Sequence, residues 1–272
     1  MTRTLPHPFD LATELAAVGD GRFAGRTAAP YANMVGPFGG ITAATLMRAI
    51  LDDPRRLAEP VSLTVNFAGP VADGPFEIDA RPVRTNRSTQ HWLLTMSQDD
   101  AVTTTATAVF ANRRPTWAAT ELTPPAAPPA ASVPVSEVPE FIAWVGNYEM
   151  RFVEGAVAEI EAGRPSSSTS TLWVRDEPPR PLDYPALTAL SDVFFPRVMH
   201  RLGRIVPAGT VSMTVYFHAT ADLLAAQGDD PILATARAQH FGNGYFDQSA
   251  QLWTADGELL VTSHQLVYFK DA

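Results

Sequence analysis

Apolar and polar residues alternate without interruption in two seven-residue stretches of this chain. In residues 61–67 the four apolar side chains would share one face of a strand, with serine, threonine and asparagine on the other. Residues 211–217 repeat this pattern and agree with the first stretch at five of seven positions. Such alternation is typical of an antiparallel strand with one buried face. The two stretches therefore predict equivalent strands.

Further elements surround each of these strands in the same order. In the first half we expect a helix from Ile41 to Leu51, starting at Gly39-Gly40, and strands near 61–68, 76–84, 90–97 and 101–111. In the second half we expect a helix from Ala186 to Leu202 and strands near 211–219, 231–240, 245–254 and 258–269, with one more strand from Thr171 to Arg175. A shared order of elements is evidence for an internal repeat.

The repeated pattern of one longer helix and several antiparallel strands predicts an α+β protein in which each sheet wraps its own helix. Between the halves, the run Pro124-Pro-Ala-Ala-Pro-Pro129 predicts an extended, poorly folded connection. We therefore divide the chain into an N-terminal module at 1–114, a linker at 115–139 and a C-terminal module at 140–272.

Composition narrows the classes of function. With 272 residues, of which 46% are hydrophobic and 18% charged, the chain can form two globular domains. No apolar run is long enough to cross a bilayer and the first residues lack the apolar core of a secretory signal, so we expect a cytoplasmic protein. The net charge of -9 and the lack of a Lys/Arg cluster argue against nucleic-acid or membrane binding and favour a small-molecule substrate.

Several kinds of catalytic site have no counterpart in the sequence. The chain has no cysteine, no nucleophile elbow, no glycine-rich dinucleotide or phosphate loop and no zinc-protease motif. Its histidines lack the spacing of metal ligands, so we expect structural or surface roles for them and neither a metal nor a cofactor. They are His7, His91, His200, His218, His240 and His264.

Asp192 lies in a helical run, residues 189–195, whose other members are largely apolar. Burying an unpaired carboxylate costs several kcal/mol or raises its pKa, so a carboxylate in such a place usually has a partner. Alternatively, Thr188, Asp192 and Pro196 are spaced by four and would form a polar stripe on a solvated helix face. The pattern leaves both interpretations open.

Gln265 should lie on the apolar face of its strand, together with Val267. A buried amide without a partner costs about 1–3 kcal/mol, so Gln265 either bonds to the backbone or points into a pocket. When Phe110 is aligned with Phe269, Ala106 lies opposite Gln265. Only the second half then carries the polar group, which favours a functional site there.

Thr210 precedes the repeated strand, and Pro60 takes its place in the first half. Strand parity puts the Thr210 side chain on the polar face with Ser212 and Thr214. A threonine at the start of a strand is also ordinary β-propensity. Taken alone, Thr210 would not indicate a site.

Together these residues carry a family resemblance. The segments Leu190-Ser-Asp-Val-Phe-Phe-Pro196, Thr210-Val-Ser-Met-Thr-Val-Tyr-Phe-His218 and Leu260-Val-Thr-Ser-His-Gln-Leu-Val-Tyr-Phe269 resemble the three signature segments of the acyl-CoA thioesterase II family, and Gly36-Pro-Phe-Gly-Gly40 resembles its Phe-Gly-Gly motif. The resemblance implies a double hot-dog fold, in which two fused modules mimic a dimer of single hot-dog proteins. It also implies hydrolysis of fatty acyl-CoA thioesters by an Asp, a Thr and a Gln that bind a water, and these fall on Asp192, Thr210 and Gln265.

Two features of the implied site remain as alternatives. Thr210 is placed by counting back from Phe217-His218, so a one-residue bulge would give the hydroxyl role to Ser212. Backbone N–H groups at Gly39-Gly40 could stabilise negative charge on the thioester oxygen, because helix N-termini favour anions and glycine permits close approach. The alternative for these glycines is a simple helix-start turn.

Two other functions stay open: an enoyl-thioester hydratase or dehydratase, which would use an Asp–His pair, and a non-catalytic acyl-thioester binding protein. His200 follows Asp192 by eight residues, about two helical turns, which is too far for such a pair on one helix. An acyl-CoA substrate needs phosphate contacts, and the candidates near predicted strand ends are Arg84, Arg87, Arg113 and Arg114. For most of these arginines the alternative role is that of a solvated surface residue. The resemblance also leads us to expect a homodimer of double modules.

Overall fold

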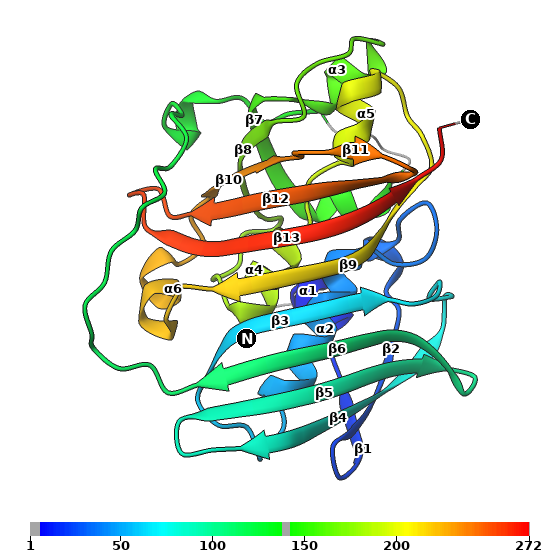
Figure 1. The fold of residues 1–272 in the computed structure, drawn as a ribbon, viewed down its shortest axis with the longest axis vertical. Coiled ribbons are helices and arrows are strands. Elements are labelled where there is room, and N and C mark those ends of the chain that lie inside the picture. Colours follow the sequence, from blue (N-terminus) through cyan, green and yellow to red (C-terminus); the bar gives the residue numbers. More distant parts are fainter. Residues whose placement is uncertain (1–5, 138–141, 272) are drawn as a thin grey trace, which may run out of the picture.

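The computed structural model describes residues 6–137 and 142–271, which form one antiparallel sheet wrapped around central helices (Figure 1). The first half contributes β1 (Ala16–Gly19), β2 (Arg22–Arg26), β3 (Glu59–Phe67), β4 (Pro75–Thr85), β5 (Thr89–Gln98) and β6 (Ala101–Ala111). The second half contributes β7 (Tyr148–Glu154), β8 (Ser170–Asp176), β9 (Ala208–Phe217), β10 (Ile232–Arg237), β11 (Phe241–Gly242), β12 (Tyr245–Trp253) and β13 (Leu259–Phe269). The strand order is β1-β2-β4-β5-β6-β3-β9-β13-β12-β10-β8-β7, with β11 paired to β12.

The helices differ in how deeply they are buried. They are α1 (Pro8–Ala12), α2 (Gly39–Leu51), α3 (Val157–Glu161), α4 (Tyr184–Leu190), α5 (Arg197–Leu202) and α6 (Ala221–Gln227), with short 3-10 turns η1 (Ala29–Tyr31), η2 (Ala130–Ser132) and η3 (Ala143–Asn147). Ten of the 13 residues of α2 are buried, as expected for a helix that is apolar nearly all round. No helix in the described ranges is long and apolar enough to span a membrane.

The α+β class and the double hot-dog fold are confirmed, and the predicted strands match β3 to β6, β8 to β10, β12 and β13 to within a few residues. The sequence pattern missed the two-residue β11, which pairs with β12, as well as β1, β2 and β7. The last three strands lie at or near the two edges of the sheet. In β7, glutamate and arginine residues interrupt the apolar pattern.

The single helix expected from Ala186 to Leu202 is wrong, because a turn at 191–196 separates α4 from α5. The α4 start is capped by Asp183, whose carboxylate accepts the Ala186 N–H at 2.9 Å. Pro196 explains the interruption, because a proline disfavours helical backbone at the residue that precedes it. The interruption places Asp192 on a turn between two helices instead of on a helix face.

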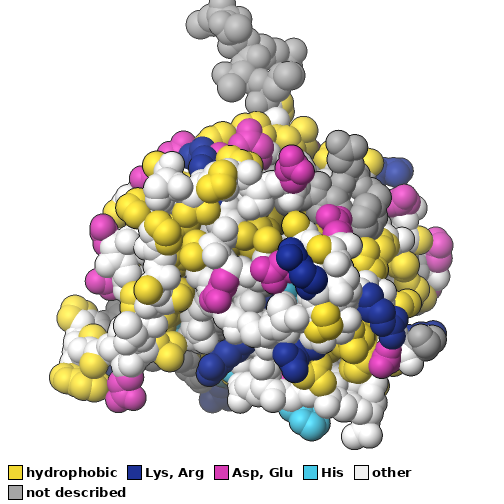
Figure 2. Space-filling model, turned by 90° about the horizontal axis from the view of Figure 1, so that it is seen from above, with side chains coloured by type: hydrophobic (Ala, Val, Ile, Leu, Met, Phe, Trp, Pro, Cys, Tyr) yellow, Lys and Arg dark blue, Asp and Glu magenta, His cyan; other side chains and the backbone are white. Residues whose placement is uncertain are grey.

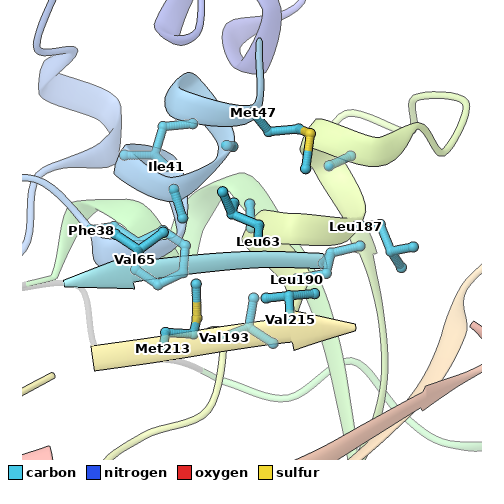
Figure 3. Packing of buried hydrophobic residues seen from close by; sticks show 14 of the residues in the cluster. Phe38, Ile41, Met47, Leu63, Val65, Leu187, Leu190, Val193, Met213 and Val215 are labelled. Atoms are coloured by element: carbon cyan, nitrogen blue, oxygen red, sulfur yellow. The ribbon is translucent and has the colours of Figure 1, made fainter. Parts of the chain in front are cut away.

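The two halves meet where β3 pairs with β9. Residues 62–66 pair antiparallel with 212–216, and at the centre the hydroxyls of Thr64 and Thr214 lie 3.0 Å apart. On the inner face, the apolar side chains of both strands point toward α2 and α4 and form one core across the seam (Figure 3). The chain therefore contains one continuous sheet with an approximate two-fold axis at this threonine pair.

Each half carries the same irregularity at the start of its seam strand. In β3, the pairing with β6 skips Val61, between Pro60 and Ser62. In β9, the pairing with β13 skips Val211, between Thr210 and Ser212. A bulge of one residue reverses the side-chain alternation beyond it. Residues before each bulge therefore point to the opposite face from that given by simple parity.

The linker is only partly as expected. Residues 112–123 are exposed, whereas the following stretch packs on the outer face of the second half against Trp173, Leu233 and Trp253. The Trp173 indole N–H donates to the Pro128 carbonyl at 2.9 Å, and Arg151 donates to the Val133 carbonyl at 2.6 Å. The expectation of a poorly folded connection is therefore wrong beyond Pro124. Residues 138 and 139 of the predicted linker, and residues 140 and 141 that follow it, lie outside the described ranges.

Candidate active site

Asp192, Thr210 and Gln265 form a hydrogen-bonded chain. The Thr210 hydroxyl donates to Gln265 Oε1 at 3.1 Å, and Gln265 Nε2 donates to Asp192 Oδ1 at 2.8 Å. The three side chains come from the start of β9, from β13 and from the turn after α4. Gln265 is only 5% exposed, and its other amide contact is Met213 Sδ at 3.5 Å. The expectation that Gln265 lies on the buried face is confirmed, and its amide bonds to the side chains of Thr210 and Asp192.

The bulge at Val211 decides which hydroxyl reaches Gln265. Gln265 pairs with Met213, and Leu266 with Ser212, but Val267 pairs with Thr210. The skipped residue turns Thr210 to the inner face, so its assignment to the polar face by parity is wrong. Ser212 follows the bulge in the chain and remains on the outer face. The structure thus brings Thr210, and not Ser212, into contact with Gln265.

Asp192 is a half-buried residue in the turn between α4 and α5. Its side chain retains partial exposure, and burial raises the pKa of Asp192 to about 7, opposed by hydrogen bonds from Gln265 and from the Gly40 N–H. Thr188 is fully buried. The solvated stripe considered for this helix is therefore not formed. A carboxyl group with a pKa near neutrality can exchange a proton under physiological conditions.

Gly39 and Gly40 bring the start of α2 against this carboxylate. A Cβ added at Gly39 would lie 2.8 Å from Asp192 Oδ2, and one at Gly40 would lie 2.5 Å from the Phe38 ring and 2.7 Å from the Ala189 carbonyl oxygen. Both positions require glycine because side chains would occupy filled space. The Gly40 N–H already donates to Asp192. Gly39 carries the first N–H of the helix, which has no carbonyl of a preceding turn to bond.

The sheet register also corrects the alignment of the two halves. Leu63 pairs with Ala108 as Met213 pairs with Gln265, so Ala108, not Ala106, is the counterpart of Gln265. Aligning Phe110 with Phe269 is therefore two residues out of register, since Phe110 pairs with Pro60 whereas Val267 pairs with the equivalent Thr210. The counterpart is alanine in either case. The polar side chain at this level is therefore present only in the second half.

His200 does not approach Asp192. It lies beside Ser170, with 3.5 Å between its Nε2 and the hydroxyl oxygen, and burial lowers the pKa of His200 to about 3. Its neighbour Arg197 is fully buried and donates to the Phe195 carbonyl and to Ser170. Within the described ranges, no cluster of three or more His, Asp or Glu side chains could hold a metal ion.

Two of the arginines suggested for phosphate binding, Arg113 and Arg84, lie away from Thr210. Arg113 bonds to the Phe217 carbonyl, at the opposite end of β9 from Thr210, and to the Pro60 carbonyl. Arg84 lies at the same far end of the sheet, where it pairs with His91 in the strand register. On the face seen in Figure 2, basic and acidic side chains are interspersed. Arg84 and Arg113 therefore lie at the opposite end of the sheet from Thr210.

Sequence reasoning missed the aromatic packing behind the glycines. Phe38 stacks on Trp144, with ring centroids 4.2 Å apart and planes inclined by 9°. Phe38 belongs to the Phe-Gly-Gly motif, but nothing in the local pattern around Trp144 indicates that it contacts a residue over a hundred positions earlier. Only the packing of the two halves reveals the pair.

Family models match both halves of the chain. The acyl-CoA thioesterase N-terminal domain matches residues 28–111 and the acyl-CoA thioesterase C-terminal domain matches residues 119–269. The comparison with curated proteins gave no match.

Solved structures share the whole architecture. A hot-dog-fold protein of unknown function from Alicyclobacillus acidocaldarius is 50% identical, with 98% of this chain and 100% of that chain covered and a TM-score of 0.94. A putative thioesterase II from Thermobifida fusca is 23% identical, with 97% of each chain covered and a TM-score of 0.82. The acyl-CoA thioesterase II TesB2 from Mycobacterium marinum is 18% identical over 97% and 98% of the chains, with a TM-score of 0.76. With family models matching most of both halves, the chain belongs to the acyl-CoA thioesterase family and is a thioester hydrolase.

Proposed function

We propose that this protein hydrolyses an acyl-CoA thioester by direct attack of a water held by Asp192 and Thr210. The observation that carries the proposal is the chain of hydrogen bonds from Thr210 through Gln265 to Asp192, at 3.1 and 2.8 Å. The direction of these bonds defines what each group can still do. Thr210 uses its proton on Gln265, so its oxygen remains free to accept one. Asp192 Oδ2 is not the oxygen that receives the Gln265 amide.

A water bound here would donate one proton to Asp192 and the other to the Thr210 oxygen. Its own lone pair would then point toward the thioester carbonyl. As the water oxygen bonds to the carbonyl carbon, Asp192 takes a proton. The C–S bond then breaks, and the proton passes from Asp192 to the departing thiolate. The products are the carboxylic acid and the free thiol, and no covalent enzyme intermediate or cofactor is required.

Negative charge on the carbonyl oxygen needs donors, and we assign this role to the Gly39 N–H. Gly39 begins α2, at the positive end of the helix, and a Cβ built on it would lie 2.8 Å from Asp192 Oδ2. Gly40, which shared the role in the sequence-based expectation, supports the carboxylate instead, because its N–H donates to Asp192. The Gly39 N–H would therefore bind the substrate carbonyl oxygen, and the Gly40 N–H would support the Asp192 base.

For the CoA phosphates, we propose Lys270 and Arg204 in place of the arginines at the far end. The Lys270 N–H donates to the Pro207 carbonyl at 2.9 Å, three residues before Thr210. Arg204 pairs with Asp271 in the same region. Both side chains are exposed to solvent. A homodimer and a cytoplasmic location remain predictions from the sequence.

The hydratase alternative would need a histidine beside Asp192, and the partners of Asp192 in the described residues are an amide side chain and a backbone N–H. The binding-protein alternative is opposed by the partial exposure and near-neutral pKa of the carboxyl group.

The first test is thiol release from a panel of acyl-CoA esters by wild type and Asp192→Asn. We expect the variant to lose about 10³-fold or more in kcat while keeping its thermal melting profile, because the amide cannot accept the proton. In wild type, kcat should rise with pH through a midpoint near 7, since the base works only when deprotonated. Unchanged turnover in Asp192→Asn would rule out this mechanism, and formation of 3-hydroxyacyl-CoA from an enoyl ester would favour the hydratase.

A further inference from the structure

The proposed site depends on a close approach between the two halves of the chain. Gly39 and Gly40 belong to the first half, whereas Asp192 follows α4 in the second. The space between them leaves no room even for a methyl group, which would lie 2.8 Å from the carboxylate oxygen. The Gly40 N–H bond also opposes the rise in the pKa of Asp192. A small shift of α2 against the Asp192 turn would therefore change both the geometry and the basicity of this carboxylate.

Trp144 touches the segments on both sides of this approach. Its ring stacks on Phe38, the residue immediately before Gly39, at 4.2 Å and 9°. It also packs against Phe195, three residues beyond Asp192, at 5.9 Å and 34°. The indole is 4% exposed. One side chain thus lies between the start of α2 and the end of the turn that carries the carboxylate.

The backbone around Trp144 is fixed to the first half. The Trp144 N–H donates to the Ala32 carbonyl at 3.1 Å, and the Asn147 side chain donates to the Pro30 carbonyl at 2.6 Å. On the other side of the stack, the Phe38 N–H donates to the Tyr31 carbonyl at 2.8 Å. Hydrogen bonds to the carbonyls of residues 30–32 therefore fix the backbone that carries both rings. Contact between them sets where residue 38, and hence Gly39, can lie.

We infer that Trp144 is a positioning residue for the proposed hydrolysis: through Phe38 and Phe195 it sets the separation between the Gly39-Gly40 turn and Asp192. The inference rests on the proposed function and adds to it a residue that does not touch the reacting atoms. Offset stacking of aromatic rings contributes directional preference beyond apolar burial. An aliphatic side chain would fill part of the volume but would not define the orientation of Phe38.

Trp253 provides a matched control. It is also buried, at 1% exposure, but it packs under the linker with Val133, Trp173 and Leu233 and contacts no part of the site. Shortening either tryptophan to leucine removes a comparable amount of apolar surface. Only the Trp144 substitution should alter the position and the pKa of the Asp192 carboxyl group.

The experiment compares wild type, Trp144→Leu, Trp144→Phe, Trp253→Leu and Asp192→Asn by kcat and KM across pH and by thermal melting. For Trp144→Leu we expect kcat to fall about tenfold or more, with KM within about threefold. Its midpoint on the pH profile should rise, because loss of the Gly40 N–H bond raises the pKa of Asp192. Trp144→Phe should recover most of the loss, whereas Trp253→Leu should lower the melting temperature without moving the midpoint.

A folded Trp144→Leu protein with the kcat and the pH midpoint of wild type would overturn the inference. An equal shift of the pH midpoint in Trp144→Leu and Trp253→Leu would also overturn it, because the effect would then not be specific to Trp144. If Trp144→Leu does not fold, Phe38→Leu tests the other half of the stack and should raise the midpoint in the same way. The two proposals fail separately. Turnover retained by Asp192→Asn removes the proposed mechanism, whereas an inactive Asp192→Asn with a normal Trp144→Leu removes only the positioning role.

Discussion

The two ends of the β3–β9 seam are related by the repeat but are built differently. At the Thr210 end, α2 begins with Gly39, beside Phe67 and the Asp192 carboxylate. At the opposite end, α4 begins with Tyr184, whose ring packs edge-on against Phe217 at 5.7 Å. Phe67 and Phe217 are the equivalent last residues of the two seam strands. A glycine and a tyrosine therefore begin the two equivalent helices.

The remaining side chains follow the same contrast. Where one end has Thr210 and Gln265, the other has Pro60 and Ala108. Tyr184 fills the second end, and its hydroxyl donates to Glu59 at 2.9 Å. Backbone geometry, including the bulge, is shared by both ends. The fold therefore supplies the same backbone at both ends of the seam, whereas a few side chains decide whether an end carries polar groups or is filled by a bulky ring.

The largest effect on this contrast should come from Gln265→Ala, which installs the residue of the filled end. We expect kcat at pH 7 to fall about 100-fold, because Asp192 loses its positioning partner and a donor that lowers its pKa. The pH midpoint should rise above about 7, so the loss should be smaller at pH 9. A pH–rate profile with an unmoved midpoint would contradict the assigned contact.

Gly39→Ala tests the need for a bare helix start. The added methyl would lie 2.8 Å from Asp192 Oδ2, so the carboxylate or the helix must move. We expect kcat to fall by about 10- to 100-fold. Gly146→Ala is the control, since its added methyl meets no atom within 4 Å. Equal kcat values for the two variants would show that the close approach does not matter.

A smaller effect is expected from Thr210→Val, which keeps the shape but removes the hydroxyl. Loss of one hydrogen bond to Gln265 and of one acceptor for water should lower kcat about tenfold. Ser212→Ala should leave kcat unchanged, because the bulge keeps Ser212 on the outer face. Measuring kcat for Thr210→Val and Ser212→Ala therefore tests the β9–β13 register. A larger loss of kcat in Ser212→Ala would assign the hydroxyl role to Ser212.

The smallest effect concerns the filled end. Tyr184→Phe removes the hydroxyl that bonds Glu59 but keeps the ring against Phe217. We expect the free energy of unfolding to fall by about 1 kcal/mol, with kcat and KM unchanged. Thermal melting should show a decrease of about 2–4 °C. A matching loss of turnover would mean that the second end contributes to catalysis.

Much of this contrast could be predicted from local sequence. Alternation in residues 61–67 and 211–217 located the seam strands, and the inward face of Gln265 followed from strand parity. Motif resemblance selected Asp192, Thr210 and Gln265, which the structure brings into one hydrogen-bonded chain. These features depend on neighbours within a few positions, where periodicity carries information.

The rest depends on contacts that local pattern does not encode. A one-residue bulge at Val211 leaves the apolar alternation of 211–217 intact but inverts Thr210. Pro196 indicates an interruption after α4, but the long apolar run around it favours a single continuous helix. The Trp144–Phe38 stack joins the two halves. Such a pair is fixed by tertiary packing, to which neither residue's neighbours contribute a signal.

Joining the halves in one chain has an evolutionary consequence. In a dimer of identical subunits, any substitution appears at both ends of the seam, so a glycine at the start of one helix would also start the other. Here the two copies meet at Thr64 and Thr214 within a single polypeptide, and each can change alone. Their association also cannot be lost by dilution. A substitution at Tyr184 therefore leaves Gly39, its counterpart at the other end, unchanged.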